Sequence, residues 1–206
     1  MPLRCSLVND PWHVLSHNGD HRAVSRHDWI RDIIVEWVKK AGGRAWVEPR
    51  QVIWHDDRRP DVRVSLGPAV FELDVSVVHP TSASHLAAAV QGSLGAAKKI
   101  SKAKSNKFGA MSRSEGSTFV PFILETYGGF CKEARDFMKE LSKHAGVHSA
   151  VYSSSDLICG LRSAIHAALF KGNLQIAVTE IQRAQPSPVS WGSASLLPRA
   201  PFRTDY

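Results

Sequence analysis

Two aspartates are the residues of this chain best suited to do chemistry. Asp61 follows a proline in the run RPDV, and Asp74 lies thirteen residues later in the run FELDVS. Apolar and polar residues alternate through both runs, which predicts two strands joined as a hairpin at residues 67–68. A hairpin would bring the two carboxylates together. Such a pair can hold Mg²⁺, which prefers a few oxygen ligands and keeps several waters.

The paired carboxylates need a positive charge nearby. Burying two like charges side by side is costly without a cation, a basic partner or a raised pKa. The alternative is that Asp61 merely follows a turn proline while Asp74 faces solvent on an edge strand. These residues alone leave both interpretations open.

A lysine-rich stretch follows the second aspartate. Within ten residues, and with no acid between them, stand Lys98, Lys99, Lys102, Lys104 and Lys107. Residues 84–106 combine Ala, Leu and Lys and predict one long helix, although Gly92 and Gly95 each weaken it by roughly 1 kcal/mol. The lysines could contact phosphates and contribute salt-sensitive affinity for nucleic acid. The alternative is a solvated helix face.

Four runs together carry a resemblance that covers most of the chain: RPDV, LDVSVVHP, AAKKISKAKSNKF and FVPFILETYGG. They resemble the restriction-endonuclease-like domain of site-specific non-LTR retrotransposons, which follows the PD-(D/E)xK nuclease pattern. The resemblance implies an α/β fold, with a small mixed sheet flanked by helices and a restriction-endonuclease-like core. It also implies DNA as the substrate, Mg²⁺ or Mn²⁺ as the cofactor, and Asp61 and Asp74 as metal ligands.

In this chain the catalytic lysine of the nuclease pattern must come from a different position than usual. It usually stands two residues after the second acid and shares its face of the strand, but that position is Ser76. In the retrotransposon group the lysine lies on the following helix, in a KxxKY-like motif. The run from Lys104 to Phe108 resembles this motif, with Phe in place of Tyr. The resemblance therefore implies Lys104 as the catalytic lysine and Lys107 as its substitute.

The N-terminal 24 residues lack periodicity and predict an irregular segment. In the same retrotransposon group a zinc knuckle ends in HxxxC before an Arg-His pair opens the first helix. Here His13 and His17 occupy the HxxxC positions, and the paired cysteines that should precede them are missing. Zinc held by His13 and His17, with Cys5 and His21 within reach, is one interpretation. Exposed loop histidines are the other.

Arg26 lies on the apolar stripe of a helix predicted over residues 26–41, with Ser25 as its N-cap. A buried arginine requires a carboxylate or a phosphate. We therefore expect Arg26 to orient the acidic site or to bind the DNA backbone, with a structural ion pair as the alternative. The other candidates are Arg59 for DNA binding and, as accessory acids, Glu36, Glu72 and Glu125.

The remaining elements complete one domain over residues 25–185. We expect a short strand at 45–47 and a buried central strand at 119–126, in which Pro121 indicates the edge or the first residues because it cannot donate a ladder hydrogen bond. Helices are predicted at 133–144, 156–169 and 174–184, the last two separated by the run Lys-Gly-Asn at 171–173. The Pro- and Ser-rich residues 186–206 are expected to form a tail. The predicted class is α/β, with helices on both faces of a small sheet.

The composition of the chain restricts its possible partners and its cellular compartment. Lys and Arg total 26 against 19 Asp and Glu, a formal charge of +7 that favours polyanionic partners, although a soluble protein can simply be basic. The three cysteines include no CxxC spacing, which indicates a reducing compartment. The chain has no apolar run of about 20 residues and no signal-peptide pattern. We therefore expect a nuclear or cytoplasmic protein that does not enter membranes.

The functional prediction is a Mg²⁺-dependent DNA endonuclease, the nuclease domain of a retroelement or a descendant put to another use. The resemblance implies a cut that primes reverse transcription, with RNA or a reverse transcriptase as further partners. A second hypothesis is an inactive nucleic-acid-binding module that keeps the fold, which would explain Ser76 and the damaged zinc motif. A third is a zinc-dependent adaptor.

Overall fold

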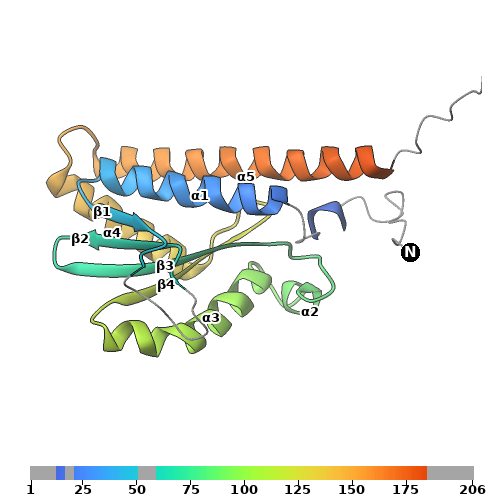
Figure 1. The fold of residues 1–206 in the computed structure, drawn as a ribbon, viewed down its shortest axis with the longest axis horizontal. Helices are drawn as coiled ribbons and strands as arrows, with labels where there is room; N and C mark the ends of the chain where they lie inside the picture. Colours follow the sequence, from blue (N-terminus) through green and yellow to red (C-terminus); the bar gives the residue numbers. More distant parts are fainter. Residues whose placement is uncertain (1–12, 17–20, 51–58, 185–206) are drawn as a thin grey trace, which may run out of the picture.

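Helices cover both faces of a mixed sheet in the computed structural model, which describes residues 13–16, 21–50 and 59–184 (Figure 1). In chain order, the elements are η1 (His13–Ser16), α1 (His21–Lys40), β1 (Arg44–Val47), β2 (Val62–Leu66), β3 (Ala69–Val78), α2 (Leu86–Ala89), α3 (Gly95–Ser114), β4 (Thr118–Glu125), α4 (Lys132–His148) and α5 (Ser154–Ala184). The predicted α/β class is confirmed. None of the described helices is long and apolar enough to cross a membrane.

The strands lie in the order β1-β2-β3-β4. β2 pairs antiparallel with both β1 and β3, and the predicted hairpin is confirmed, with Gly67 at a φ of +61° in its turn. β3 and β4 pair in parallel, so a crossover must join them, and α2 and α3 supply it. The prediction of a central strand at 119–126 is wrong: β4 is an edge strand, a position that tolerates Pro121 because proline has no N–H to donate.

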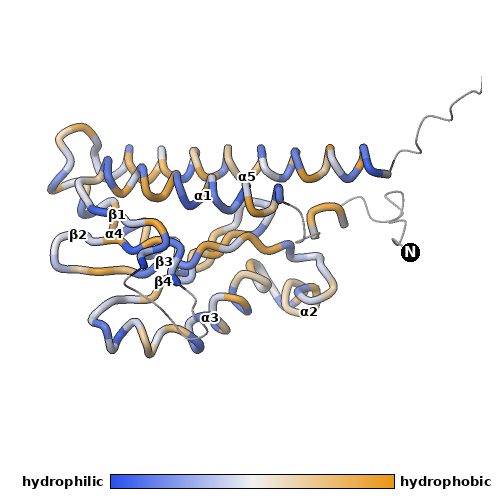
Figure 2. The backbone as a smooth tube through the Cα atoms, in the orientation of Figure 1, coloured by the Kyte–Doolittle hydropathy of each residue, from blue (hydrophilic) through white to orange (hydrophobic). Residues whose placement is uncertain are grey.

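The two faces of the sheet differ in chemistry. One face is apolar: Phe71 of β3 and Phe122 of β4 both contact Phe137 of α4, with ring centroids 5.5 and 6.3 Å apart. α1 and α5 lie side by side above the sheet (Figure 1), and hydrophobic residues concentrate where the elements meet (Figure 2). The opposite face carries the polar residues of β3, and α3 covers it. Core residues lie on both faces, with Ile123, Ala96 and Ala97 on the α3 side, so the polar residues of β3 occupy a limited region of that face.

The start of α1 differs from the prediction. The helix begins at His21, so the described part of the segment expected to be irregular contains η1 and the first turn of α1. Ser25 does not cap the helix, because its hydroxyl donates to the carbonyl of His21 at 3.0 Å within the first turn. A serine inside a helix can bond back to the preceding turn in this way.

Two further helix predictions are wrong. The long helix predicted over 84–106 is divided into α2 and α3, with Gly92 between them at a φ of +151°. The two predicted C-terminal helices are one, since α5 continues through Gly172. A Cβ on Gly172 would lie 2.5 Å from Cγ of Arg26, so this glycine permits a close approach rather than ending the helix.

Cys131 ties α4 to β4. Its thiol accepts the N–H of Ala134 at 3.4 Å as the N-cap of α4 and donates to the carbonyl of Pro121 at 3.1 Å. Burial raises the pKa of Cys131 to about 11, which keeps the thiol protonated at neutral pH. Cys131 therefore acts as a structural residue at the edge of the core.

Candidate active site

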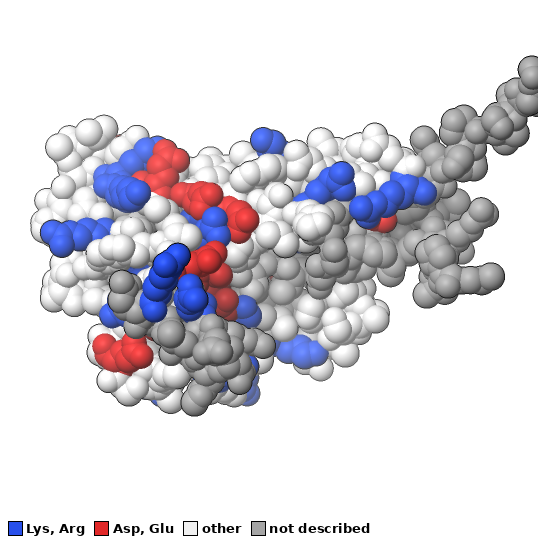
Figure 3. Space-filling model, in the orientation of Figure 1, with Lys and Arg blue, Asp and Glu red and all other residues white. Residues whose placement is uncertain are grey.

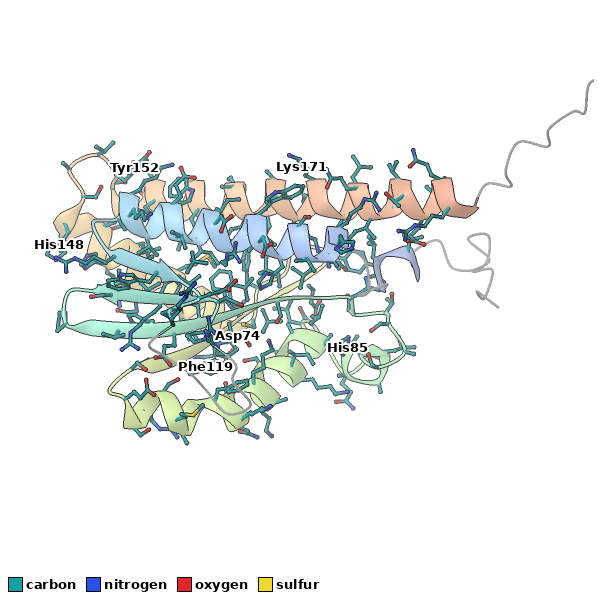
Figure 4. All side chains as sticks on the ribbon, in the orientation of Figure 1. Asp74, His85, Phe119, His148, Tyr152 and Lys171 are labelled. Carbon is teal, nitrogen blue, oxygen red and sulfur yellow. The ribbon has the colours of Figure 1, made fainter. Side chains whose placement is uncertain are left out.

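The two predicted metal ligands lie near each other on the β2–β3 hairpin: Asp61 immediately precedes β2, and Asp74 lies on β3 where α3 covers the sheet. Val62 pairs with Leu73, so one step further along the ladder Asp61 lies opposite Asp74. In Figure 4 Asp74 lies between the sheet and α3. Burial raises the pKa of Asp74, and the nearby negative charge of Asp61 raises it further, against the opposing effect of Lys104. The hairpin therefore brings the two carboxylates within electrostatic reach of each other.

Asp61 is held in place by two donors. Its Oδ2 atom accepts the backbone N–H of Val75 at 2.6 Å and lies 3.1 Å from Nε2 of His27 in α1. The other ring nitrogen of His27 lies 3.2 Å from Asp28. Burial lowers the pKa of His27, but Asp61 and Asp28 outweigh it, so the net shift is upward. The raised pKa favours the protonated, positively charged form of His27 beside Asp61.

Sequence reasoning missed His27 as a site residue. The available signal was its place beside Arg26 in the Arg-His pair that opens the first helix. Nothing in the local sequence says that α1 passes close to the start of β2.

Lys104 reaches the second aspartate from α3. Its ammonium donates to Oδ2 of Asp74 and, at 2.6 Å, to the hydroxyl of Ser76. Ser76 occupies the strand position where the nuclease pattern usually has its lysine, so Lys104 brings a charge to that place from the helix. On α3, Lys104 shares the stripe of the buried residues Ser101 and Phe108, which faces the sheet.

A pocket of about 250 Å³ opens beside this contact. Its lining residues are Arg59, Asp74, Ile100, Ala103, Lys104, Lys107 and Phe108. Lys107 and Arg59 are exposed cations, as a phosphate-binding rim requires. Phe108 is only 5% exposed and stacks on Phe119 at a centroid distance of 5.6 Å, so it packs under the helix instead of offering a surface for a base.

The other lysines of α3 lie outside the pocket. Lys98, Lys99 and Lys102 are exposed, and Lys99 donates to the carbonyl of Ser84 at 2.8 Å. Figure 3 shows basic and acidic side chains side by side near the middle of the viewed face. The charges of the viewed face are therefore mixed.

The three candidate accessory acids do not join the acidic pair. Glu36 is exposed and pairs with Lys40 at 2.6 Å on the surface of α1. Glu125 is buried and accepts the N–H of Ala97 at 3.1 Å, which stabilises the first turn of α3. Glu72 is fully buried and is held by side chains of β2 and α3.

Among the described residues no carboxylate pairs with Arg26, so the expected contact with the acidic pair is absent there, and the predicted contact with a DNA phosphate stays a prediction. The guanidinium, 3% exposed, donates to the side-chain oxygen of Asn173 at 2.6 Å, and Asn173 donates to the carbonyl of Thr126 at 2.8 Å. Burial lowers the pKa of Arg26 to about 10. An amide from α5 takes the place of the anion because the uninterrupted α5 passes directly beside α1. Arg26 therefore links helices and does not touch the acidic pair.

The zinc prediction falls almost entirely outside the described residues. His17 and Cys5 are not among them, and His13 is described only as the first residue of η1. Within the described ranges, no three His, Cys, Asp or Glu side chains gather as a metal site. Any metal at the acidic pair would therefore have Asp61 and Asp74 as its protein carboxylates.

Comparison with known proteins supports a retroelement relationship. No protein-family profile matches the chain. Over 158 residues it is 23% identical to the "Retrotransposable element SLACS 132 kDa protein" of Trypanosoma brucei gambiense. The aligned region covers 73% of this chain and 13% of that protein. The chain is therefore a distant relative of a retrotransposon protein and spans a small part of its length.

Proposed function

We propose that this chain is a metal-dependent DNA endonuclease domain with a restriction-endonuclease-like core. The observation that carries the proposal is the contact of Lys104 with both Asp74 and Ser76. It supplies, from a helix, the positive charge that the nuclease pattern places on the strand. A retrotransposon protein as a distant relative supports the same class.

The acidic pair is chemically suited to Mg²⁺ or Mn²⁺. Asp61 and Asp74 each use Oδ2 for contacts with the protein, while Oδ1 of each makes no hydrogen bond to any described residue. Two carboxylate oxygens would thus remain for a metal, and Mg²⁺ is commonly held by one or two carboxylates with waters and substrate phosphates. When bound, the ion would polarise the phosphate and lower the pKa of a bound water.

The protein side chains would perform the remaining tasks. Lys104 would stabilise negative charge as it develops on the phosphate and would orient the attacking water, because its ammonium is already fixed by two acceptors. His27 and the N–H of Val75 would hold Asp61 in one orientation. Arg59 and Lys107, at the pocket, would contact the flanking phosphates, and the exposed lysines 98, 99 and 102 would add salt-sensitive affinity.

The biological setting follows from the resemblance. We propose a nuclear role in which a nick or cut at a DNA target primes reverse transcription, with RNA or a reverse transcriptase as partners. The second candidate is an inactive module that binds nucleic acid. The observation in its favour is that Lys104 already pairs with Asp74 and so offsets part of the negative charge that a bound metal would compensate.

Cleavage of supercoiled plasmid in Mg²⁺ or Mn²⁺ tests the proposal. We expect metal-dependent nicking by the wild type and a reduction of about 10² to 10³ in Lys104→Ala, the scale of one deleted electrostatic stabiliser. Lys143→Ala is the matched control, because Lys143 is an exposed lysine paired with Glu140 on α4. Adding Ser76→Lys to Lys104→Ala should recover part of the activity, since position 76 faces the same ammonium site.

The outcomes separate the two candidates. DNA binding without cleavage in either metal would support the inactive module. Normal cleavage by Lys104→Ala would transfer the role to Lys107 or Lys99. If these three single variants all cleave normally, the lysine mechanism is wrong.

A further inference from the structure

Two histidines form a pair in the last turn of α4, away from the acidic site. His144 and His148 are four residues apart, so they lie on one face of the helix. Their ring centroids are 4.2 Å apart, and the ring planes differ by 36°. Figure 4 shows His148 at one end of the molecule and Asp74 near its middle. The pair therefore belongs to a different part of the molecule.

One ring nitrogen of this pair lacks a hydrogen-bond partner among the described residues. Nε2 of His144 is buried and has no hydrogen-bond partner among the described residues. A buried polar nitrogen without a partner is unfavourable, so a ligand that engaged it would be stabilising. His144 also borders a pocket of about 260 Å³, together with Glu140, Lys143, Leu66, Ala69 and Phe71. His148 is exposed, so the pair is accessible from solvent.

We propose that His144 and His148 chelate a divalent cation of the Zn²⁺, Ni²⁺ or Cu²⁺ type. Neutral imidazole suits these ions, whereas Mg²⁺ prefers oxygen. Two bonds of about 2.0 to 2.1 Å meeting at a tetrahedral angle span about 3.4 Å between nitrogens. The ring centroids lie 4.2 Å apart, so side-chain rotation would have to bring one nitrogen of each ring to this span around the ion.

The remaining coordination positions are open to water and to one acid. Glu140 lies one turn before His144 on the same helical face and lines the same pocket. It now accepts a hydrogen bond from Lys143 at 2.8 Å, in an exposed pair that a metal can replace at little cost. The proposed site is thus a two-histidine chelate, and Glu140 would have to turn from Lys143 towards the ion to become a third ligand, because no three such side chains among the described residues are already gathered there.

The bound ion would stabilise the native fold. His144 lies against the β2–β3 hairpin through Leu66, Ala69 and Phe71, so an ion on its ring would order the last turn of α4 beside that hairpin. A ligand that binds only the folded chain raises the melting temperature, and the rise grows with the logarithm of the free ligand concentration once this exceeds the Kd. The site is independent of the proposed nuclease function.

Zn²⁺ titration of the full chain by calorimetry, at about pH 8 where free imidazole is neutral, tests the proposal. His148→Ala and His144→Ala should each weaken binding by about 10²-fold, because the second ligand acts at a high effective concentration. Each should also abolish the Zn²⁺-dependent rise in melting temperature. His148 is exposed, so its variant should fold like the wild type, which circular dichroism can verify.

The matched control addresses the other candidate zinc ligands of this chain. The double variant His13→Ala, His17→Ala should bind Zn²⁺ like the wild type. Unchanged affinity in His148→Ala, or no Zn²⁺ binding by the wild type, would overturn the proposal. Loss of binding only in the His13 and His17 variant would assign the ion to the N-terminal segment and would overturn it as well.

Discussion

Strand β3 carries two carboxylates two residues apart on the same face, and their surroundings differ. Glu72 is fully buried, and both of its oxygens are engaged, by Arg63 at 3.1 Å and by the hydroxyl of Ser112 at 2.7 Å. The side chain of Asp74 is 17% exposed and borders a pocket, and its described hydrogen bonds use one oxygen. Both acids are contacted by α3.

The difference distinguishes a structural carboxylate from one suited to a ligand. Glu72 joins β2, β3 and α3, with donors on both oxygens. Asp74 has a second carboxylate beside it, and its pKa is raised by burial and by Asp61. The fold therefore holds Asp74 where its ionised form is unfavourable without a further cation, which is the arrangement expected of a metal ligand.

The largest expected effect is that of Asp74→Asn. Cleavage should fall by at least about 10³, because the variant loses one of two metal ligands. The free energy of unfolding should stay equal or rise. The raised pKa means that folding disfavours the charged form at neutral pH, and asparagine carries no charge. Plasmid cleavage and urea unfolding measure the two effects. Strong destabilisation would place Asp74 in the same structural role as Glu72.

Glu72→Ala should behave in the opposite way. Removing this carboxylate takes away the ion-pair partner of Arg63 and the hydrogen-bond acceptor of the buried Ser112 hydroxyl. The free energy of unfolding should therefore fall by about 3 kcal/mol. The midpoint of urea unfolding measures this loss. The fraction that remains folded should cleave with normal metal dependence. A fully stable but inactive variant would show that the two acids do not differ as we describe.

A smaller effect is expected at His27, which holds Asp61 in the acidic site. His27→Ala should reduce cleavage by about tenfold and raise the Mg²⁺ concentration needed for half-maximal activity, as seen when a group that orients a metal ligand is lost. His27→Gln keeps an N–H donor and should retain more activity. Equal activity of the alanine variant and the wild type, at limiting Mg²⁺, would remove His27 from the site.

The smallest effect is expected at Ser112, on the Glu72 side of the comparison. Ser112→Ala should cost about 1 kcal/mol of unfolding free energy, since one buried hydrogen bond is lost while Arg63 remains. Ser114→Ala is the control, because its hydroxyl is exposed and bonds only within its own helix. Similar stabilities of the two variants would argue that the hydroxyl contributes little to holding Glu72.

Much of the hairpin and of the acidic pair could be predicted from the sequence. Alternating apolar residues determine which side chains of a strand face the core, so the pairing of Val62 with Leu73 and the position of Asp61 opposite Asp74 follow from local pattern. The motif on the following helix also predicts that Lys104 approaches Asp74, as it does, although the same motif leaves Lys107 as a substitute. These features depend on residues close together in the chain.

Other features were decided only by contacts between distant segments. The motif FELD does not reveal which acid will be enclosed, because Glu72 meets a hydroxyl 40 residues away. His27 joins the site only because α1 passes the start of β2, 34 residues further along the chain. Gly172 looked like a helix break, yet in the fold it makes room for Arg26. Local propensity determined the strands, and tertiary packing decided what each charged side chain meets, because packing brings those partners together from separate elements.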